Sequence, residues 1–441
     1  MKKNSGVALR VFCGLVGVMI AFPAQADTLE EALSAAYTSN PVLLAELAAA
    51  RAADKGVSVA YAGFHPEIRS SGTYAWQQNA IKRTVGTSAY QTTNTTPLGV
   101  TGSVSQNLFS GFRTINEVKQ AKSLARAGLA NLLNVEQQVM LDAVTAYFDV
   151  YQNEAEVRLN QGQVEVLTRQ LKAAQDRFEV GEDTNTGVAQ SNARLAFAKS
   201  SLIRAEASLV SARAAYERAI GQAPGTLELG TLPDIPATIE DVHKIALGNN
   251  PALQTAQHVE RASDIGISMA RGALLPTLDV TARTSHAWDR TDFTERNIDN
   301  TLTVELSVPL YNGIVYPGIG QLSQQNAQDR LMVAAAGRQV IEGVQGAWVG
   351  LKSAEAQIAS DREQVTANEI ALEGVRQEAQ VGSQTTLDVL NAAQDLLNAR
   401  VSLTRAERNR YVAYYSLLSV MGVLTARDLE LPVEYHDSAD Y

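Results

Sequence analysis

The chain has 441 residues, of which 45% are hydrophobic and 19% are charged, so it can bury a substantial core and is not a disordered protein. Its formal net charge of −10 argues against nucleic acid as a partner. The sequence contains one long apolar run, at its N-terminus, which excludes a polytopic helical membrane protein.

That first segment, residues 1–26, has the three parts of a secretory signal peptide. Two lysines precede an apolar stretch at 11–22, and an A-x-A site ending at Ala26 predicts cleavage before Asp27. The stretch is shorter than the roughly 20 residues that a membrane anchor needs. Cleavage removes three basic residues and the single cysteine, Cys13, so we expect an exported chain of net charge −13 without disulfides.

The rest of the chain consists of two copies of one unit, because short motifs recur at a nearly constant offset. Thr28 with Glu31 and Thr238 with Asp241 each predict a capped helix start. An Asn-Pro pair follows in each copy and breaks that helix. We therefore divide the chain into a first repeat (27–220), a linker rich in proline and glycine (221–237), a second repeat (238–431) and an acidic tail (432–441).

Each copy then contains a pair of alternating strands. Hydrophobic and polar residues alternate over Leu98–Leu108 and Thr301–Leu310, and the predicted partner strands are Ile68–Trp76 and Leu278–Trp288. About ten residues is the length that a tilted strand needs to cross a bilayer. Aromatic residues near the strand ends suit the two membrane interfaces: Tyr74, Trp76 and Trp288 at one end, Phe109 and Tyr311 at the other.

The same alternation also fits a sheet that covers a soluble core with one face. We favour the membrane because the chain is exported, lacks cysteine after cleavage and connects its strands through long polar segments, Gln77–Pro97 and Asp289–Asp299. Four strands cannot close a barrel, and open edges are not tolerated in hydrocarbon. The chain must then oligomerise: a dimer gives a plugged barrel and a trimer an open one, but the sequence does not choose three copies over four.

Very long helices follow each strand pair. The first runs from about Phe112 to Phe178, and at ~1.5 Å per residue it is about 100 Å long. Apolar residues recur in heptads on both sides of a polar break at Val180–Thr186, which predicts an antiparallel coiled-coil hairpin. The second copy repeats the pattern, with its break at Val381–Thr386.

The order of these motifs resembles the TolC family of outer-membrane efflux proteins over nearly the whole chain after the signal peptide. It includes the LF-x-G and LY-x-G sequences at 108–111 and 310–313. The resemblance implies an α+β membrane protein that forms a homotrimer, with a twelve-stranded barrel in outer-membrane lipid above a periplasmic helical tunnel. It also implies a passive exit duct for drugs or secreted polypeptides, served by a periplasmic adaptor and an inner-membrane transporter of RND or ABC type.

The resemblance also assigns roles near the hairpin tips. Val180-Gly181 and Val381-Gly382, with Ser383, match the turns at which the family's adaptor docks, although glycine there also simply permits the turn. Asp388 matches an aspartate of the family's periplasmic constriction. A helix N-terminal carboxylate gives the same pattern.

This chain departs from the family around that constriction. Gln384 replaces a basic residue, Asn391 replaces a second acid, and Gly187 stands where the first copy would carry the aspartate. The latch of the closed state therefore cannot be transferred to this chain.

The sequence offers no motif for catalysis, phosphate binding or metal binding. It has no Walker lysine loop, no G-x-S-x-G and no H-E-x-x-H, and its five histidines are scattered. We expect a protein without enzymatic activity or cofactor. The alternative is a soluble periplasmic adaptor or scaffold with coiled-coil hairpins, although paired ten-residue strands are not typical of that class.

Overall fold

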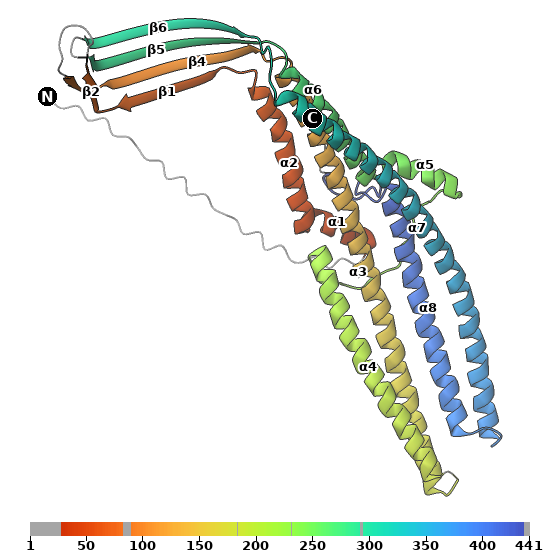
Figure 1. The fold of residues 1–441 in the computed structure, drawn as a ribbon. Coiled ribbons are helices and arrows are strands. Elements are labelled where there is room, and N and C mark those ends of the chain that lie inside the picture. The colour runs from red at the N-terminus through yellow and green to blue at the C-terminus, as the bar shows by residue number, and fades with distance from the viewer. Residues whose placement is uncertain (1–27, 83–89, 183, 231, 292–293, 436–441) are drawn as a thin grey trace, which may run out of the picture.

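The computed structural model describes residues 28–82, 90–182, 184–230, 232–291 and 294–435, so the predicted signal peptide lies outside the described residues. The molecule is elongated (Figure 1). A curved sheet forms one end, and long helices run away from it to two hairpin tips at the other end. None of the described helices contains an apolar stretch long enough to span a membrane.

Each repeat opens with a short helix followed at once by a longer one. Thr28 and Glu31 form the predicted capping box, and Thr238 accepts a hydrogen bond from the backbone N–H of Asp241. Asn40 and Asn250 end the short helices and cap the next ones, whose first residue is proline. The helices are α1 (Leu29–Ser39) and α2 (Pro41–Ala62) in the first repeat, and α5 (Ile239–Asn249) and α6 (Pro251–Gly272) in the second.

The two Asn-Pro motifs also make a tertiary contact. The side-chain amide of Asn40 donates to the carbonyl of Ala219 at 3.0 Å, and that of Asn250 donates to the carbonyl of Val420 at 3.1 Å. Both acceptors lie in the last turn of a repeat's final helix, where carbonyl groups have no partner within the helix. Each asparagine thus joins the beginning of its repeat to the end.

Two long helical hairpins form most of the molecule's length, as predicted. The first helix of each has 67 or 66 residues, which corresponds to about 100 Å. Apolar side chains such as Leu167 with Leu195, and Leu372 with Leu396, are buried near the tips of the two hairpins. The hairpins are α3 (Arg113–Glu179) with α4 (Asn185–Ile220), and α7 (Val315–Gln380) with α8 (Thr386–Met421).

The two predicted strand pairs are joined into one antiparallel sheet of order β1-β4-β5-β6. The sequence predicted two separate pairs, but β4 of the first repeat pairs with β5 of the second over most of its length. Backbone hydrogen bonding does not depend on side-chain pattern, so this pairing has no sequence signature. The strands are β1 (Glu67–Tyr74), β4 (Leu98–Phe109), β5 (Thr277–Thr291) and β6 (Thr294–Ser307).

The connections within the pairs differ from the long polar loops that we predicted. The segment Gln77–Pro97 contains a two-stranded hairpin, β2 (Gln77–Ile81) with β3 (Gln91–Thr95), and residues 83–89 between them are not described. Most of Asp289–Asp299 belongs to β5 and β6, which pair beyond a register shift after Trp288. These parts of the strands have polar residues on both faces. Because neither face is buried, the sequence shows no hydrophobic alternation there, and the pattern did not predict them as strands.

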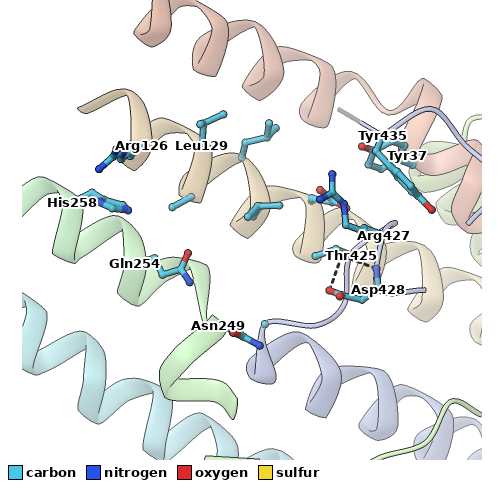
Figure 2. Close-up of a pocket in the computed structure, with 15 residues that line it drawn as sticks. Tyr37, Arg126, Leu129, Asn249, Gln254, His258, Thr425, Arg427, Asp428 and Tyr435 are labelled. Atoms are coloured by element: carbon cyan, nitrogen blue, oxygen red, sulfur yellow. Dashed lines mark hydrogen bonds between the residues drawn. The ribbon is translucent and has the colours of Figure 1, made fainter. Parts of the chain in front are cut away.

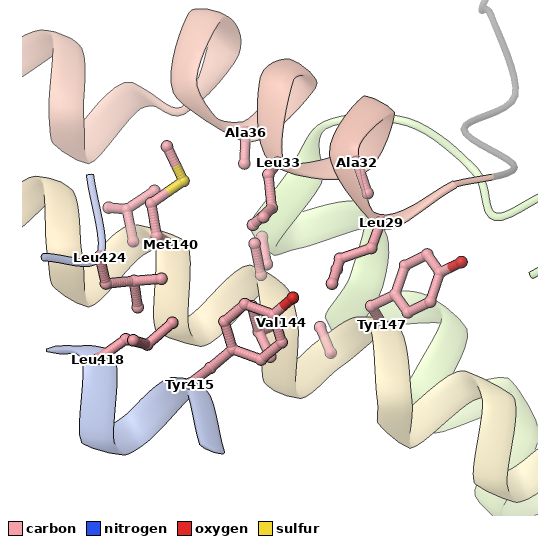
Figure 3. Close-up of a cluster of buried hydrophobic side chains, with 14 of the residues drawn as sticks. Leu29, Ala32, Leu33, Ala36, Met140, Val144, Tyr147, Tyr415, Leu418 and Leu424 are labelled. Atoms are coloured by element: carbon pink, nitrogen blue, oxygen red, sulfur yellow. The ribbon is translucent and has the colours of Figure 1, made fainter. Parts of the chain in front are cut away.

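The largest hydrophobic core of the described residues lies where the short helices cross the long ones. Tyr147, Phe148 and Leu33 are fully buried in it, together with Leu424 from the segment after α8 (Figure 3). All its described buried members come from helices or from segments beside them, and none comes from a strand. The core therefore stabilises the helical body alone.

The linker and the start of the tail pack onto this core. Leu227 is buried, and the hydroxyl of Tyr147 donates to the carbonyl of Glu228 at 2.8 Å. Val433 and Tyr435, from the segment after α8, also pack against the core. Residues 436–441 lie outside the described residues. These contacts tie the linker and the segment after α8 to the same part of the helical body.

Candidate channel wall and hairpin tips

The four-stranded sheet has one apolar and one polar face. The cross-strand register places even-numbered residues on one face and odd-numbered residues on the other. On the even face, Leu302, Val304 and Leu306 are 63–73% exposed, and no described element covers them. Further apolar members of that face are Ile68, Leu98, Val100, Val104, Leu278, Val280 and Ala282.

The length of this apolar face matches a bilayer. It extends from Leu278 to Trp288 along β5 and therefore covers about 34 Å of strand. Strands tilted by 35–45° would carry it through about 25 Å, the height of the apolar band in outer-membrane barrels. Exposed apolar area of this extent marks a surface for lipid or for another protein.

The five predicted interface aromatics lie at the two ends of the sheet. Tyr74 and Trp288 occupy one cross-strand row with Leu98 at the end far from the helices, and Trp76 follows β1 there. The guanidinium of Arg296 lies 6.0 Å from the Trp288 ring. Phe109 ends β4 beside the helices, and Tyr311 is exposed between β6 and α7.

Both hairpin tips end their first helix in the same way. Gly181 and Gly382 adopt φ values of +84° and +80°, which glycine accepts at little cost. The N–H groups of Gly181 and Glu182 donate to the carbonyls of Phe178 and Arg177, and the second tip has equivalent bonds. Val180 and Val381 beside them are 71% and 81% exposed. Each tip therefore displays an apolar side chain beside a hydrogen-bonded turn.

Asp388 lies in the first turn of α8 and is partly exposed. Its carboxylate accepts hydrogen bonds from the backbone and hydroxyl of Thr385 and completes a capping box. Both hydrogen bonds lower the pKa of Asp388, and the bond from the hydroxyl has the larger effect. The carboxylate is therefore ionised at neutral pH. Gly187 takes the equivalent place in α4, where Thr184 caps the helix without a carboxylate.

The two tips are joined by a polar contact that the sequence did not reveal. The guanidinium of Arg194 on α4 donates to the side-chain oxygen of Asn391 on α8 at 2.6 Å. Gln384 is exposed in the turn before α8. The contact links the first hairpin to the second within one chain, close to the predicted constriction.

Further from the tips, the two hairpins meet along a charged seam. Arg405 of α8 pairs with Glu156 of α3 at 2.8 Å, and Arg408 pairs with Asp149 at the same distance. The Glu156 side chain is largely buried, and its carboxylate raises the pKa of Arg405. Ion pairs thus join the two hairpins, and others such as Arg213–Glu154 and Arg400–Glu369 join the two helices within a hairpin.

A cavity of about 510 Å³ lies along α3, between α6 and the segment after α8 (Figure 2). Glu136 lies at its wall, only 5% exposed, and accepts a hydrogen bond from the backbone N–H of Ala426 at 2.7 Å. Burial raises the pKa of Glu136 to about 7; the Ala426 bond opposes this and the charge of Asp428 adds to it. At the other end, burial and Arg126 lower the pKa of His258. The described residues contain no group of three or more side chains that could hold a metal ion.

Comparison with known proteins settles what kind of protein carries these features. The sequence model of the family described as "Outer membrane efflux protein" matches residues 32–222 and 242–423, one match in each repeat. The chain belongs to this family. It is accordingly an outer-membrane protein that serves as an exit duct, and the predicted family, fold class and location are confirmed.

Individual relatives of this efflux protein cover most of its length. The outer membrane efflux protein BepC of Brucella suis is 32% identical over 95% of this chain and 90% of its own. The outer membrane protein TolC of Escherichia coli is 24% identical over 92% of this chain and 84% of its own. The membership argues against a soluble adaptor, the alternative that the sequence left open.

Solved structures share the fold. A structure of CusC superposes with a TM-score of 0.76 at 17% identity, and covers 92% of this chain and 95% of its own. The outer membrane protein VceC of Vibrio cholerae also gives 0.76, at 16% identity, over 89% of this chain and 96% of its own. At this level of identity the likeness concerns the fold alone.

Sequence reasoning missed several residues of the wall and seam. Asp149 and Glu156 are seven residues apart on α3, so polar residues at a heptad spacing inside a coiled coil could have indicated the seam. Arg194 and Glu136 had no such signal, because their partners lie 197 and 290 residues away in the chain. Long-range contacts of this kind have no local pattern.

Proposed function

We propose that three copies of the chain close a twelve-stranded barrel and work as a passive exit duct without enzymatic activity. The carrying observation is the exposed apolar face on a sheet that ends in two unpaired edges, β1 and β6. Neighbouring strands alternate in direction, so β6 of one copy meets β1 of the next in antiparallel orientation. Closure removes every open edge, as a sheet in hydrocarbon requires.

Mass and location test this proposal together. The chain expressed with its leader should sediment with outer membranes, and light scattering in detergent should give three chains per particle. Semi-native electrophoresis should show an oligomer that heating converts to the monomer. A monomeric chain in the soluble periplasmic fraction would refute the proposal.

We propose small toxic compounds as the cargo. BepC is named as an efflux protein and shares 32% identity, whereas the alkaline protease secretion protein AprF of Pseudomonas aeruginosa shares 24% over 71% of the chain. Deletion of the gene should lower the tolerated concentration of dyes and detergents, and plasmid expression should restore it. Loss of a protein from the culture medium, with tolerance unchanged, would assign the duct to type I secretion instead.

The hairpin tips are proposed to dock a periplasmic adaptor that connects the duct to an inner-membrane transporter of RND or ABC type. Val180, Gly181, Val381, Gly382 and Ser383 form these tips, and a Cβ added at either glycine would contact nothing within 4 Å. Val381→Glu should weaken crosslinking to the adaptor while trimers persist, and Val381→Ile should retain it. Unchanged crosslinking in Val381→Glu would refute docking at this tip.

Asp388 is proposed to form an acidic ring at the entrance of the trimer, beside Gln384 and Asn391. Its lowered pKa keeps the carboxylate charged, and three such groups near one axis favour cations. Asp388→Asn should reduce cation selectivity and polycation block in planar bilayers. Thr385→Val loses the cap but retains the charge; if it has the same effect, the cap rather than the ring explains the result.

The Arg194–Asn391 contact is proposed to restrain the closed entrance in place of the family's ion pair. It joins α4 to α8 at 2.6 Å, so the second hairpin cannot move from the first without breaking it. Asn391→Ala should raise single-channel conductance. An unchanged conductance in the variant would show that the entrance is held by other contacts.

A further inference from the structure

On the polar face of the sheet, two pairs of like-charged residues lie in separate rows, here called tiers. Asp279 of β5 and Glu305 of β6 lie directly opposite each other at the end beside the helices. Arg69 and Arg283 share a row further out, with Ser103 of β4 between them. Glu67 of β1 lies in the row between the two tiers, and Asp299 of β6 lies in the row beyond the arginines. Four positions along β5 separate the tiers, which corresponds to about 13 Å.

The first tier places two like charges in one cross-strand pair. Such a pair is destabilising in a sheet, where opposite charges or neutral residues are favoured at directly opposed positions. Asp279 accepts a hydrogen bond from the side-chain amide of Asn107 at 2.8 Å, and Glu305 is exposed. The fold therefore tolerates repulsion between the carboxylates of Asp279 and Glu305, although the backbone pairing of the two strands does not depend on these side chains.

The second tier has the opposite sign. Arg283 is exposed, and Arg69 is bridged to Glu67 on its own strand at 2.6 Å, which neutralises part of its charge. The row between the tiers consists of Glu67, Ser105, Thr281 and Thr303, so its charge is the carboxylate that bridges Arg69. Along β5 and β6 the charge thus changes from the two carboxylates to Arg283, and then to Asp299 one row further out.

We propose that these tiers are a selectivity element of the duct, an acidic ring beside the helical tunnel followed by an arginine ring nearer the outside. The inference rests on the proposed function, because the polar face lines a lumen only if three sheets close into a barrel. Three copies then place six carboxylates in the first ring and three exposed Arg283 side chains in the second. The low-dielectric wall strengthens the field of each ring inside the lumen. Asp279, Glu305 and Arg283 are the residues that determine the preference between cationic and anionic permeants in this part of the duct.

Reversal potentials in a potassium chloride gradient across planar bilayers test the proposal. Trimers carrying Asp388→Ala serve as the background, so that carboxylates at the entrance do not dominate the current. At ~0.1 M salt we expect Asp279→Asn with Glu305→Gln to lower the ratio of K⁺ to Cl⁻ permeability about twofold, and Arg283→Gln to raise it about twofold. Both shifts should fade at ~1 M salt, where the Debye length falls to about 3 Å.

Arg296→Gln provides the matched control, because it makes the same charge change on the opposite face of the sheet. It should leave the ratio unchanged. Semi-native electrophoresis confirms that each variant forms trimers before its current is measured. If trimers conduct and no tier variant shifts the ratio, the tiers play no part in selectivity although the duct stands. If the unsubstituted chain forms no trimer and no channel, the proposed function itself fails.

Discussion

The helical body and the sheet bury their apolar residues in different ways. In the body, side chains such as Tyr147 and Phe148 are fully buried against other helices of the same chain. In the sheet, Leu302 and Val304 are mostly exposed although they alternate with polar residues as strand residues of a folded sheet do. The body therefore resembles a water-soluble protein with its own core, whereas the sheet is complete only in lipid and beside further copies.

Leu302→Arg should give the largest effect, because it places a charge in the middle of the face assigned to lipid. An arginine near the bilayer centre costs about 2–4 kcal/mol per copy, and every copy in the assembly adds this cost. We expect loss of the heat-modifiable oligomer from outer membranes. The control Thr303→Arg lies on the other face of the same strand and should assemble normally; the reverse result would mean that the faces are assigned wrongly.

Phe148→Ala tests the body, since this ring is fully buried and stacks on Tyr411 with 4.4 Å between centroids. Truncation of a buried phenylalanine costs about 3–5 kcal/mol of unfolding free energy. Thermal unfolding followed by helical circular dichroism should show this loss. Phe197→Ala, at a ring that is half-exposed, should change it by less than about 1 kcal/mol. Equal losses would contradict the burial of Phe148 in the core of the body.

Glu136 makes the stability of the body depend on pH. The folded pKa of about 7 lies above the ordinary value of 4.5, so the folded state binds more protons between these values, and its stability falls as pH rises through them. The loss amounts to at most about 3 kcal/mol. Denaturant titrations at pH 5 and pH 8 should show it in the unsubstituted chain and not in Glu136→Gln. Glu206 is exposed, so Glu206→Gln should retain the dependence of stability on pH. If Glu206→Gln also abolished this dependence, Glu136 would not be its cause.

Arg405→Ala should give the smallest effect, at the seam between the hairpins. The pair with Glu156 is half-buried, but the Arg405 side chain is more than half exposed and solvent screens it, so we expect a loss of about 1 kcal/mol. Denaturant unfolding measures this loss. Arg169→Ala breaks an exposed pair within α3 and should cost less than about 0.5 kcal/mol. If Arg169→Ala lost more unfolding free energy than Arg405→Ala, the ion pair between the hairpins would add nothing to stability.

The local elements could be predicted because their causes are local. Pro41 and Pro251 start helices, Gly181 and Gly382 end them, and the alternation in β6 gives its two faces. The ends of the strands were predicted less accurately than their faces. The prediction ended β6 at Leu310, whereas the strand stops at Ser307, because Pro309 restricts the residue before it and cannot donate to a ladder.

Within the candidate site, the sequence located residues but not their partners. It identified Asp388, either for the constriction or as a helix N-terminal carboxylate, and the structure shows the capping box that this carboxylate forms with Thr385. It also identified Asn391, but only the structure shows Asn391 bound to Arg194. The β4–β5 pairing and the Glu136–Ala426 bond were likewise absent from every local pattern.

The sequence by itself determined the duplicated unit, the long hairpins and a strand face that needs an apolar environment. Propensity, capping and periodicity act over a few residues, so they are written in the order of the amino acids. The tertiary structure alone decided which strands are neighbours, where the two repeats touch and which charges share a row. Those choices depend on contacts between segments that are far apart in the chain, and such contacts form only when the whole chain packs.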